Sequence, residues 1–374
     1  MLYSEKEQPQ ISLLKRLNIL DRFLSLWIIV TMVVGVITGY FAPSVGEALQ
    51  SVKVGSVSLA VALGLILMLL PVFCKVPYEN LKYIFKTSNL KVQLMFSIGL
   101  NWIIGPLLMT ALAWATLPDL PQYRNGVILV GLARCIAMVL LWNSLANGSA
   151  EYCTILVAAN SILQLLLYSP LAVLFINVIS DGSSSSTHGD ISLFFWRVTQ
   201  SVLIFLGIPF VIGIMIRYSL IFFFKREWFN NVFVPRFSPL ALIGLLYTIF
   251  VLFAVQGHLI VTDIGSVARV AVPMLLYFTI MFFGTLLLAY LFKFPYDLAV
   301  TQSFTASSNN FELAIAIAIA TFGLTSPEAL SATVGPLIEV PVLLCLVHVT
   351  LRFQSWWEKK IPAKFSHMGY ISTP

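Results

Sequence analysis

Two polar stretches interrupt long apolar runs of this chain: Gly131-Leu132-Ala133-Arg134-Cys135 and Ser307-Ser308-Asn309-Asn310-Phe311-Glu312. The first lies midway along the fourth apolar run and the second midway along the ninth, so they occupy matching places in the two halves. A charged side chain at the centre of a bilayer costs several kcal/mol, which makes ionisable residues there candidates for a functional site. Paired interruptions of this kind indicate a transporter whose substrate site is built from both halves.

The composition is that of a membrane protein. Of the 374 residues, 59% are hydrophobic and 10% are charged, and the mean hydropathy is +0.92. A soluble domain carries roughly 25% charged residues. A membrane-spanning helix needs about 20 mostly apolar residues, and in lipid its backbone groups must be satisfied internally. The sequence therefore predicts an all-α polytopic membrane protein with ten spans, at 23–41, 54–73, 92–116, 125–146, 153–178, 192–216, 237–257, 268–292, 298–322 and 329–351.

The basic residues indicate the orientation of these spans. If the N-terminus is cytosolic, most of the 22 Lys and Arg residues fall in cytosolic segments, as the positive-inside rule requires. The net charge of +6 is then a topology signal, and no nucleic-acid partner is expected. The polar first 22 residues do not resemble a cleaved signal peptide. We expect a multi-pass protein of the plasma membrane with both termini in the cytosol.

A serine- and glycine-rich segment divides the chain. Five spans precede it and five follow it, and because five is odd the second set enters the membrane from the opposite side. Two such halves are inverted repeats, in which interrupted helices offer their half-helix ends to a substrate. The predicted parts are a cytosolic segment at 1–22, a first five-helix repeat at 23–178, an extracellular linker at 179–191, a second repeat at 192–351 and a cytosolic tail at 352–374.

Cys135 is the sharpest candidate for contact with a substrate. Arg134 is its neighbour in sequence, and a nearby guanidinium favours the thiolate form of a cysteine. Adjacent residues of a regular helix point roughly 100° apart, so direct pairing requires a distorted helix. A buried thiolate suggests a soft substrate such as a thiophilic metal or metalloid. The alternatives are a packed thiol at Cys135 and an Arg134 that bonds the carbonyls of a broken helix.

The second stretch supplies a carboxyl group and two amides. Glu312 in a low-dielectric site suits a group that binds and releases protons during transport, and its alternative is a neutral structural donor. Asn309 and Asn310 can offer carbonyl oxygens to a cation or contact the hydroxyls of a substrate. Glu339, between Pro336 and Pro341, is a further intramembrane carboxyl with a coupling or a structural role.

The remaining polar residues favour no enzyme. Cys74 and Cys153 lie near the cytosolic ends of their spans, where they either capture a thiophilic substrate or simply pack. The four cysteines form no CxxC pair, and the four histidines form no HExxH motif. No glycine-rich phosphate loop is present, and we expect neither a cofactor nor catalysis.

Five segments carry a resemblance to a known family. They are PVFCKVPY at 71–78, GLARCIAMV at 131–139, WN at 142–143, SSNNFELAIA at 307–316 and GPLIEVPV at 335–342. These segments resemble the arsenite efflux permeases of the bile acid/arsenite/riboflavin transporter superfamily, and the likeness runs over nearly the whole chain. Cys74 and Cys153 look like the extra cysteines of fungal members.

The resemblance implies both a fold and an activity. The fold has ten helices in two inverted five-helix repeats, with the broken fourth and ninth helices crossing. The activity is export of arsenite, and of antimonite, in exchange for protons, which confers arsenic resistance. The family's essential thiol maps onto Cys135 and its essential carboxylate onto Glu312.

A sodium-coupled carrier of organic anions with the same fold is the alternative function. The oxygen ligands of sodium would then be Asn309, Asn310, Gln302 and Glu312, and Cys135 would have no purpose. A non-transporting membrane sensor is disfavoured, because the chain has no sizeable soluble region.

Overall fold

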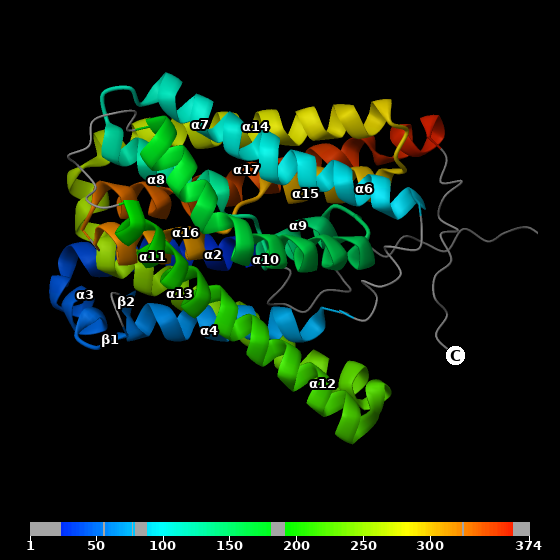
Figure 1. Ribbon diagram of the computed structural model, residues 1–374, viewed down its shortest axis with the longest axis horizontal. Helices are drawn as coiled ribbons and strands as arrows, with labels where there is room; N and C mark the ends of the chain where they lie inside the picture. Colours follow the sequence, from blue (N-terminus) through cyan, green and yellow to red (C-terminus); the bar gives the residue numbers. More distant parts are fainter. Residues whose placement is uncertain are drawn as a thin grey trace, which may run out of the picture.

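The computed structural model describes residues 24–54, 57–76, 78, 88–180, 191–323 and 325–361. The predicted cytosolic segment at 1–22, most of the linker and most of the tail lie outside these residues. The described part is almost entirely helical (Figure 1), which confirms the all-α polytopic fold.

The elements before the linker include two π-helical segments, η3 and η4. In chain order they are α2 (Leu24–Phe41), α3 (Pro43–Gln50), β1 (Lys53–Val54), β2 (Val57–Ser58), α4 (Leu59–Lys75), α6 (Ser88–Gly99), η3 (Leu100–Ile104), α7 (Gly105–Thr116), α8 (Pro121–Leu132), α9 (Met138–Leu145), α10 (Ala150–Ala172) and η4 (Val173–Ser180).

The elements after the linker include two further π-helical segments, η5 and η6. They are α11 (Ile191–Val202), η5 (Leu203–Gly207), α12 (Ile208–Trp228), η6 (Phe229–Phe233), α13 (Val234–Thr262), α14 (Ile264–Leu291), α15 (Tyr296–Ser307), α16 (Phe311–Phe322) and α17 (Pro327–Lys360).

By length and composition, five helices of the described residues can cross a membrane, or six if α2 and α3, bent by 101°, form one span. One of the five is the stretch Ile191–Thr262, within which the backbone at Lys225 is non-helical, with φ of 66°. The count of ten spans and the inverted repeat stay predictions.

One predicted boundary is wrong. The second span was expected from residue 54, but β1 and β2 form a short antiparallel pair there and α4 begins at Leu59. The hydroxyl of Ser58 accepts a hydrogen bond from the backbone N–H of Val61 at 3.2 Å. A serine N-cap of this kind starts a helix because it satisfies a donor that has no partner within the helix.

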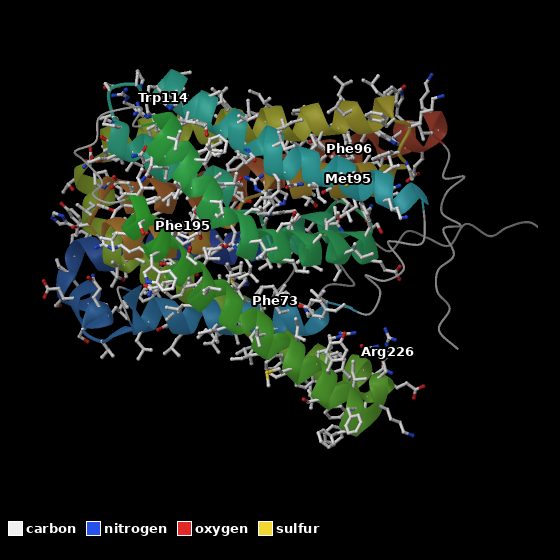
Figure 2. All side chains as sticks on the ribbon, in the orientation of Figure 1. Phe73, Met95, Phe96, Trp114, Phe195 and Arg226 are labelled. Atoms are coloured by element: carbon white, nitrogen blue, oxygen red, sulfur yellow. The ribbon has the colours of Figure 1, made fainter. Side chains whose placement is uncertain are left out.

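The helices pack in two groups. In one group α13 lies against α2 and α4, and α12 lies against α4; in the other, α7, α8, α14, α15, α16 and α17 pack together. Figure 1 shows the first group along the lower part of the molecule and α12 projecting from it. Arg226 lies on this projecting end (Figure 2), and Phe73 is fully buried where α4 meets α12.

Helices α8 and α15 are both interrupted near the middle of the second group. Helix α8 ends at Leu132 and α9 starts at Met138, while α15 ends at Ser307 and α16 starts at Phe311. Every residue of α15 except Asp297 is buried. Irregular backbone at membrane depth is tolerated only where protein or a water-filled cavity covers it, and here protein covers both breaks.

Candidate functional site

The two breaks meet each other directly. Arg134 and Asn309 form an isolated antiparallel β-bridge, and the backbone N–H of Asn310 donates to the carbonyl of Ala133 at 3.0 Å. The side-chain amide of Asn309 donates to the carbonyls of Val130 at 2.8 Å and of Ala133 at 3.1 Å. The last carbonyls of a helix have no partner within that helix, so the second break supplies the partners that the end of α8 requires.

We call the place where the two breaks meet, residues 133–137 and 308–310, the crossing. Arg134 links the crossing to α14. Its guanidinium donates to the hydroxyl of Tyr277 at 2.9 Å and to the carbonyl of Gly131. Its backbone N–H donates to the side-chain oxygen of Gln164 on α10. A Cβ added to Gly105 would lie 2.8 Å from the guanidinium, so the glycine leaves room for it. These contacts fit the structural alternative raised for Arg134 from the sequence.

Cys135 faces acidic and hydroxyl groups. Its side chain is 1% exposed, and its sulfur accepts a hydrogen bond from the backbone N–H of Val139 at 3.2 Å. The thiol lies within hydrogen-bonding reach of the Ser308 side chain and within electrostatic reach of Glu339 and Glu312. The structure therefore brings a thiol, a hydroxyl and two carboxyl groups together at the crossing.

Glu339 reaches the crossing from α17. Its Oε1 accepts a hydrogen bond from the Ser308 hydroxyl at 2.5 Å and a longer one from the backbone N–H of Asn309 at 3.4 Å. Glu312 lies in the first turn of α16 and interacts electrostatically with Glu339. The N-terminus of a helix favours negative charge, which suits the position of Glu312. Both side chains are buried, at 1% and 6% exposure.

The side-chain amides of Asn309 and Asn310 each form hydrogen bonds through only one of their two polar atoms. The Oδ1 of Asn310 accepts from the backbone N–H of Leu313 at 3.1 Å and caps α16, while the amide group of Asn309 binds α8. The other polar atom of each side chain, Oδ1 of Asn309 and Nδ2 of Asn310, is buried without a partner. Buried polar groups normally have partners, so these two atoms are available to a polar ligand.

The accessory thiols occupy different places. Cys153 on α10 contacts the carbonyl of Val139 at 4.0 Å, so Val139 touches both Cys153 and Cys135. Cys74 lies instead between α4 and α12, where its thiol donates to the carbonyl of Gly213 at 3.5 Å. All four cysteines are free. Within the described ranges, no group of three or more His, Cys, Asp or Glu side chains could hold a resident metal ion.

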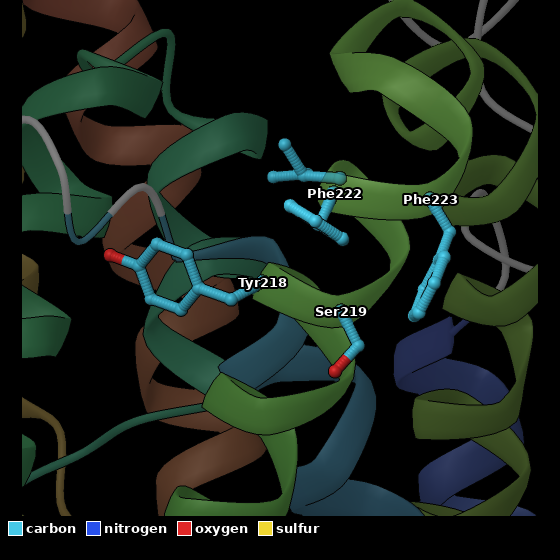
Figure 3. A pocket seen from close by; sticks show the side chains of 5 residues that line it. Tyr218, Ser219, Phe222 and Phe223 are labelled. Atoms are coloured by element: carbon cyan, nitrogen blue, oxygen red, sulfur yellow. The ribbon is translucent and has the colours of Figure 1, made fainter.

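The hollow in Figure 3 lies away from this crossing. It is on α12 and is lined by Tyr218, Ser219, Ile221, Phe222 and Phe223. None of the residues predicted to form the site lines it. Because the phenylalanines are strongly exposed, we read the hollow as part of the lipid-facing surface.

Reasoning from sequence missed Tyr277, Gln164 and Gly105, and it assigned Ser308 no role. The available signal was the same for Tyr277, Gln164 and Ser308: each is a polar side chain inside an apolar run. Such a signal marks a residue that needs a partner, but it does not say which partner.

Comparison with known proteins gives a consistent result. The model of the sodium bile acid symporter family matches residues 62–263. The arsenical-resistance protein Acr3 of Corynebacterium glutamicum is 44% identical over 90% of this chain and 90% of its own length. An uncharacterized transporter of Synechocystis is 31% identical over 92% of this chain and 91% of its own. The Acr3 of Alkaliphilus metalliredigens is 30% identical over 92% and 95%. The chain thus belongs to the sodium bile acid symporter family and, within it, to the arsenite efflux permeases.

Proposed function

We propose that this protein exports arsenite, and also antimonite, from the cytosol across the plasma membrane in exchange for protons. The observation that carries the proposal is the Cys135 thiol placed beside Ser308, Glu339 and Glu312 at the crossing. A soft metalloid prefers a thiolate ligand, and carboxyl groups beside the thiol can move the protons that its binding displaces. The names of two relatives, both arsenical-resistance proteins, point to the same substrate.

Loading is a substitution at arsenic. Arsenite at neutral pH is mainly the uncharged trihydroxide. The sulfur of Cys135 forms a bond to arsenic as one hydroxide leaves, and the thiol proton leaves with that hydroxide as water. Ser308 donates to Glu339 at 2.5 Å and is in reach of the thiol. It can therefore pass the thiol proton to Glu339 and from there to the leaving hydroxide.

The protonation state of Glu312 decides whether arsenite is held or released. When ionised, Glu312 accepts hydrogen bonds from the remaining arsenic hydroxyls, and the unpartnered atoms of Asn309 and Asn310 orient them. A proton arriving from outside neutralises Glu312 and weakens that hold. Water then hydrolyses the sulfur–arsenic bond, which restores the thiol and the trihydroxide. The empty carrier returns with its proton and delivers it to the cytosol, so one proton enters for each arsenite that leaves.

A gradient-exchange experiment in everted membrane vesicles tests this function. We expect an imposed proton gradient, and not a sodium gradient, to drive arsenite accumulation. Glu312→Gln should abolish the response to the gradient, whereas Glu151→Gln, at an exposed carboxyl at the start of α10, should not. Sodium-driven uptake of an organic anion without arsenite transport would favour the alternative that the family name suggests.

A further inference from the structure

Five buried amide side chains outside the substrate contacts form a file between α6, η3, α10 and α15. We define the amide file as Gln93, Asn101, Asn160, Gln164 and Gln302. They are between 0% and 7% exposed, and in each of them one side-chain polar atom is buried without a partner. The elements that carry them pack against one another.

The hydrogen bonds that the file does make determine which atom of each amide is left without a partner. Gln302 donates through Nε2 to the backbone carbonyl of Gln93 at 3.0 Å and to the Tyr152 hydroxyl at 2.6 Å, so its Oε1 is left without a partner. Asn101 donates through Nδ2 to Ser97, which leaves its Oδ1.

The same holds on the side of α10. Asn160 accepts through Oδ1 from the Trp102 indole at 3.0 Å, which leaves its Nδ2. Gln164 accepts through Oε1 from the backbone of Arg134, which leaves its Nε2. The free donors of the file therefore lie on α10, and its free acceptors lie on α6, η3 and α15.

The file runs from one end of the molecule to the crossing. Gln93 and Asn101 are eight residues apart, which is about 12 Å along a helix, and Asn160 and Gln164 share one face of α10 because they are four residues apart. Gln164 ends the file on the Arg134 backbone. Its other end, near the starts of α6, α10 and α15, lies on the side that the predicted topology places in the cytosol (Figure 1).

Buried polar atoms in a protein interior are satisfied by protein or by ordered water, and such waters make about three hydrogen bonds each. We propose that the amide file holds a chain of water molecules that carries protons between the crossing and the cytosol. Amide side chains do not titrate near neutral pH. They therefore bind the water molecules, and the protons move along the chain of water. Around Tyr152, which binds Gln302, the apolar side chains of Leu94, Leu156 and Leu298 pack together and border the proposed path.

The presence of water can be tested without any transport assay. X-ray pulses convert bound water to hydroxyl radicals, which label nearby aromatic side chains of the purified full-length protein. Trp102 and Trp357 are both buried, at 6% and 3% exposure, but Trp102 donates to Asn160 of the file, whereas Trp357 donates to the backbone carbonyl of Phe294. We expect Trp102 to be labelled severalfold faster than Trp357. Equal rates in the wild type would overturn the proposal.

The role of the water chain in coupling proton movement to arsenite transport rests on the proposed function, so it needs a second measurement. Gln302→Leu should abolish proton movement driven by arsenite and lower Trp102 labelling, while the variant still binds arsenite. Gln256→Leu, which removes a buried amide of α13 outside the file, should match the wild type in all three measurements. A wild type that moves arsenite without protons contradicts the proposed function. A proton-coupled wild type that is matched by Gln302→Leu contradicts the water path alone.

Discussion

The Tyr277 hydroxyl is the side-chain partner that fixes the Arg134 guanidinium at the crossing, and Tyr277→Phe removes it. The variant loses the bond from Arg134 at 2.9 Å and the bond that Tyr277 donates to the Ala306 carbonyl at 3.3 Å. A hydrogen bond to a buried charged group contributes about 1.5–3 kcal/mol. A neutral side-chain bond within a membrane protein contributes about 0.6 kcal/mol. We therefore expect Tyr277→Phe to lower the free energy of unfolding by about 2–3.5 kcal/mol.

Tyr296→Phe is the matched control for this measurement. Tyr296 is also buried, at 4% exposure, but the partners of its hydroxyl are neutral: it donates to the carbonyl of Ala146 at 3.0 Å and shares a hydrogen bond with the Thr350 side chain. At about 0.6 kcal/mol for each neutral bond, its loss should lower the free energy of unfolding by about 1 kcal/mol. Reversible unfolding in mixed micelles gives both values. If Tyr277→Phe costs no more than Tyr296→Phe, the guanidinium does not depend on Tyr277 and our account of the crossing is wrong.

Three further substitutions test other contacts. Gly105→Ala places a Cβ 2.8 Å from the buried guanidinium and should abolish arsenite transport by inserted protein, whereas Gly99→Ala, with nothing within 4 Å, should not; equal activity would contradict the crowding argument. Ser308→Ala breaks the proton link to the carboxyl of α17 and should slow arsenite binding at least about tenfold, as stopped-flow quenching of tryptophan fluorescence can show, while the threonine variant should recover the rate. The Arg269 guanidinium, 2.5 Å away, lowers the pKa of Asp119 to about 2. The stability from this pair is complete above the ordinary aspartate pKa of about 3.9 and is lost as the pH falls through the folded value. Asp119→Asn should therefore leave the pH profile of transport near neutrality unchanged, and a shifted profile would refute this.

The sequence was sufficient to place the helix breaks. A charged residue in the middle of an apolar run predicts an interruption, and both interruptions are present. It also predicted a common centre for Cys135 and Glu312, and in the structure the two side chains lie within electrostatic reach of each other. These inferences needed only local pattern and the cost of polarity in lipid.

The partners of those residues could not be found in this way. Arg134 is next to Cys135 in sequence, yet its guanidinium bonds Tyr277, which is 143 residues away. Glu339 meets Ser308 across 31 residues. Such pairs depend on how the helices pack, and no periodicity within one helix records that. The short β pair before α4 was missed because its apolar residues suit a strand as well as a helix.

The central claim is that arsenite is carried on the Cys135 thiol. The direct test is accumulation of arsenite in everted vesicles under an imposed proton gradient, for the wild type, Cys135→Ser and Cys345→Ser. Cys345 is exposed on α17 and serves as the control for loss of a thiol. We predict that the wild type and Cys345→Ser accumulate arsenite and that Cys135→Ser does not. Normal accumulation by Cys135→Ser would contradict the claim.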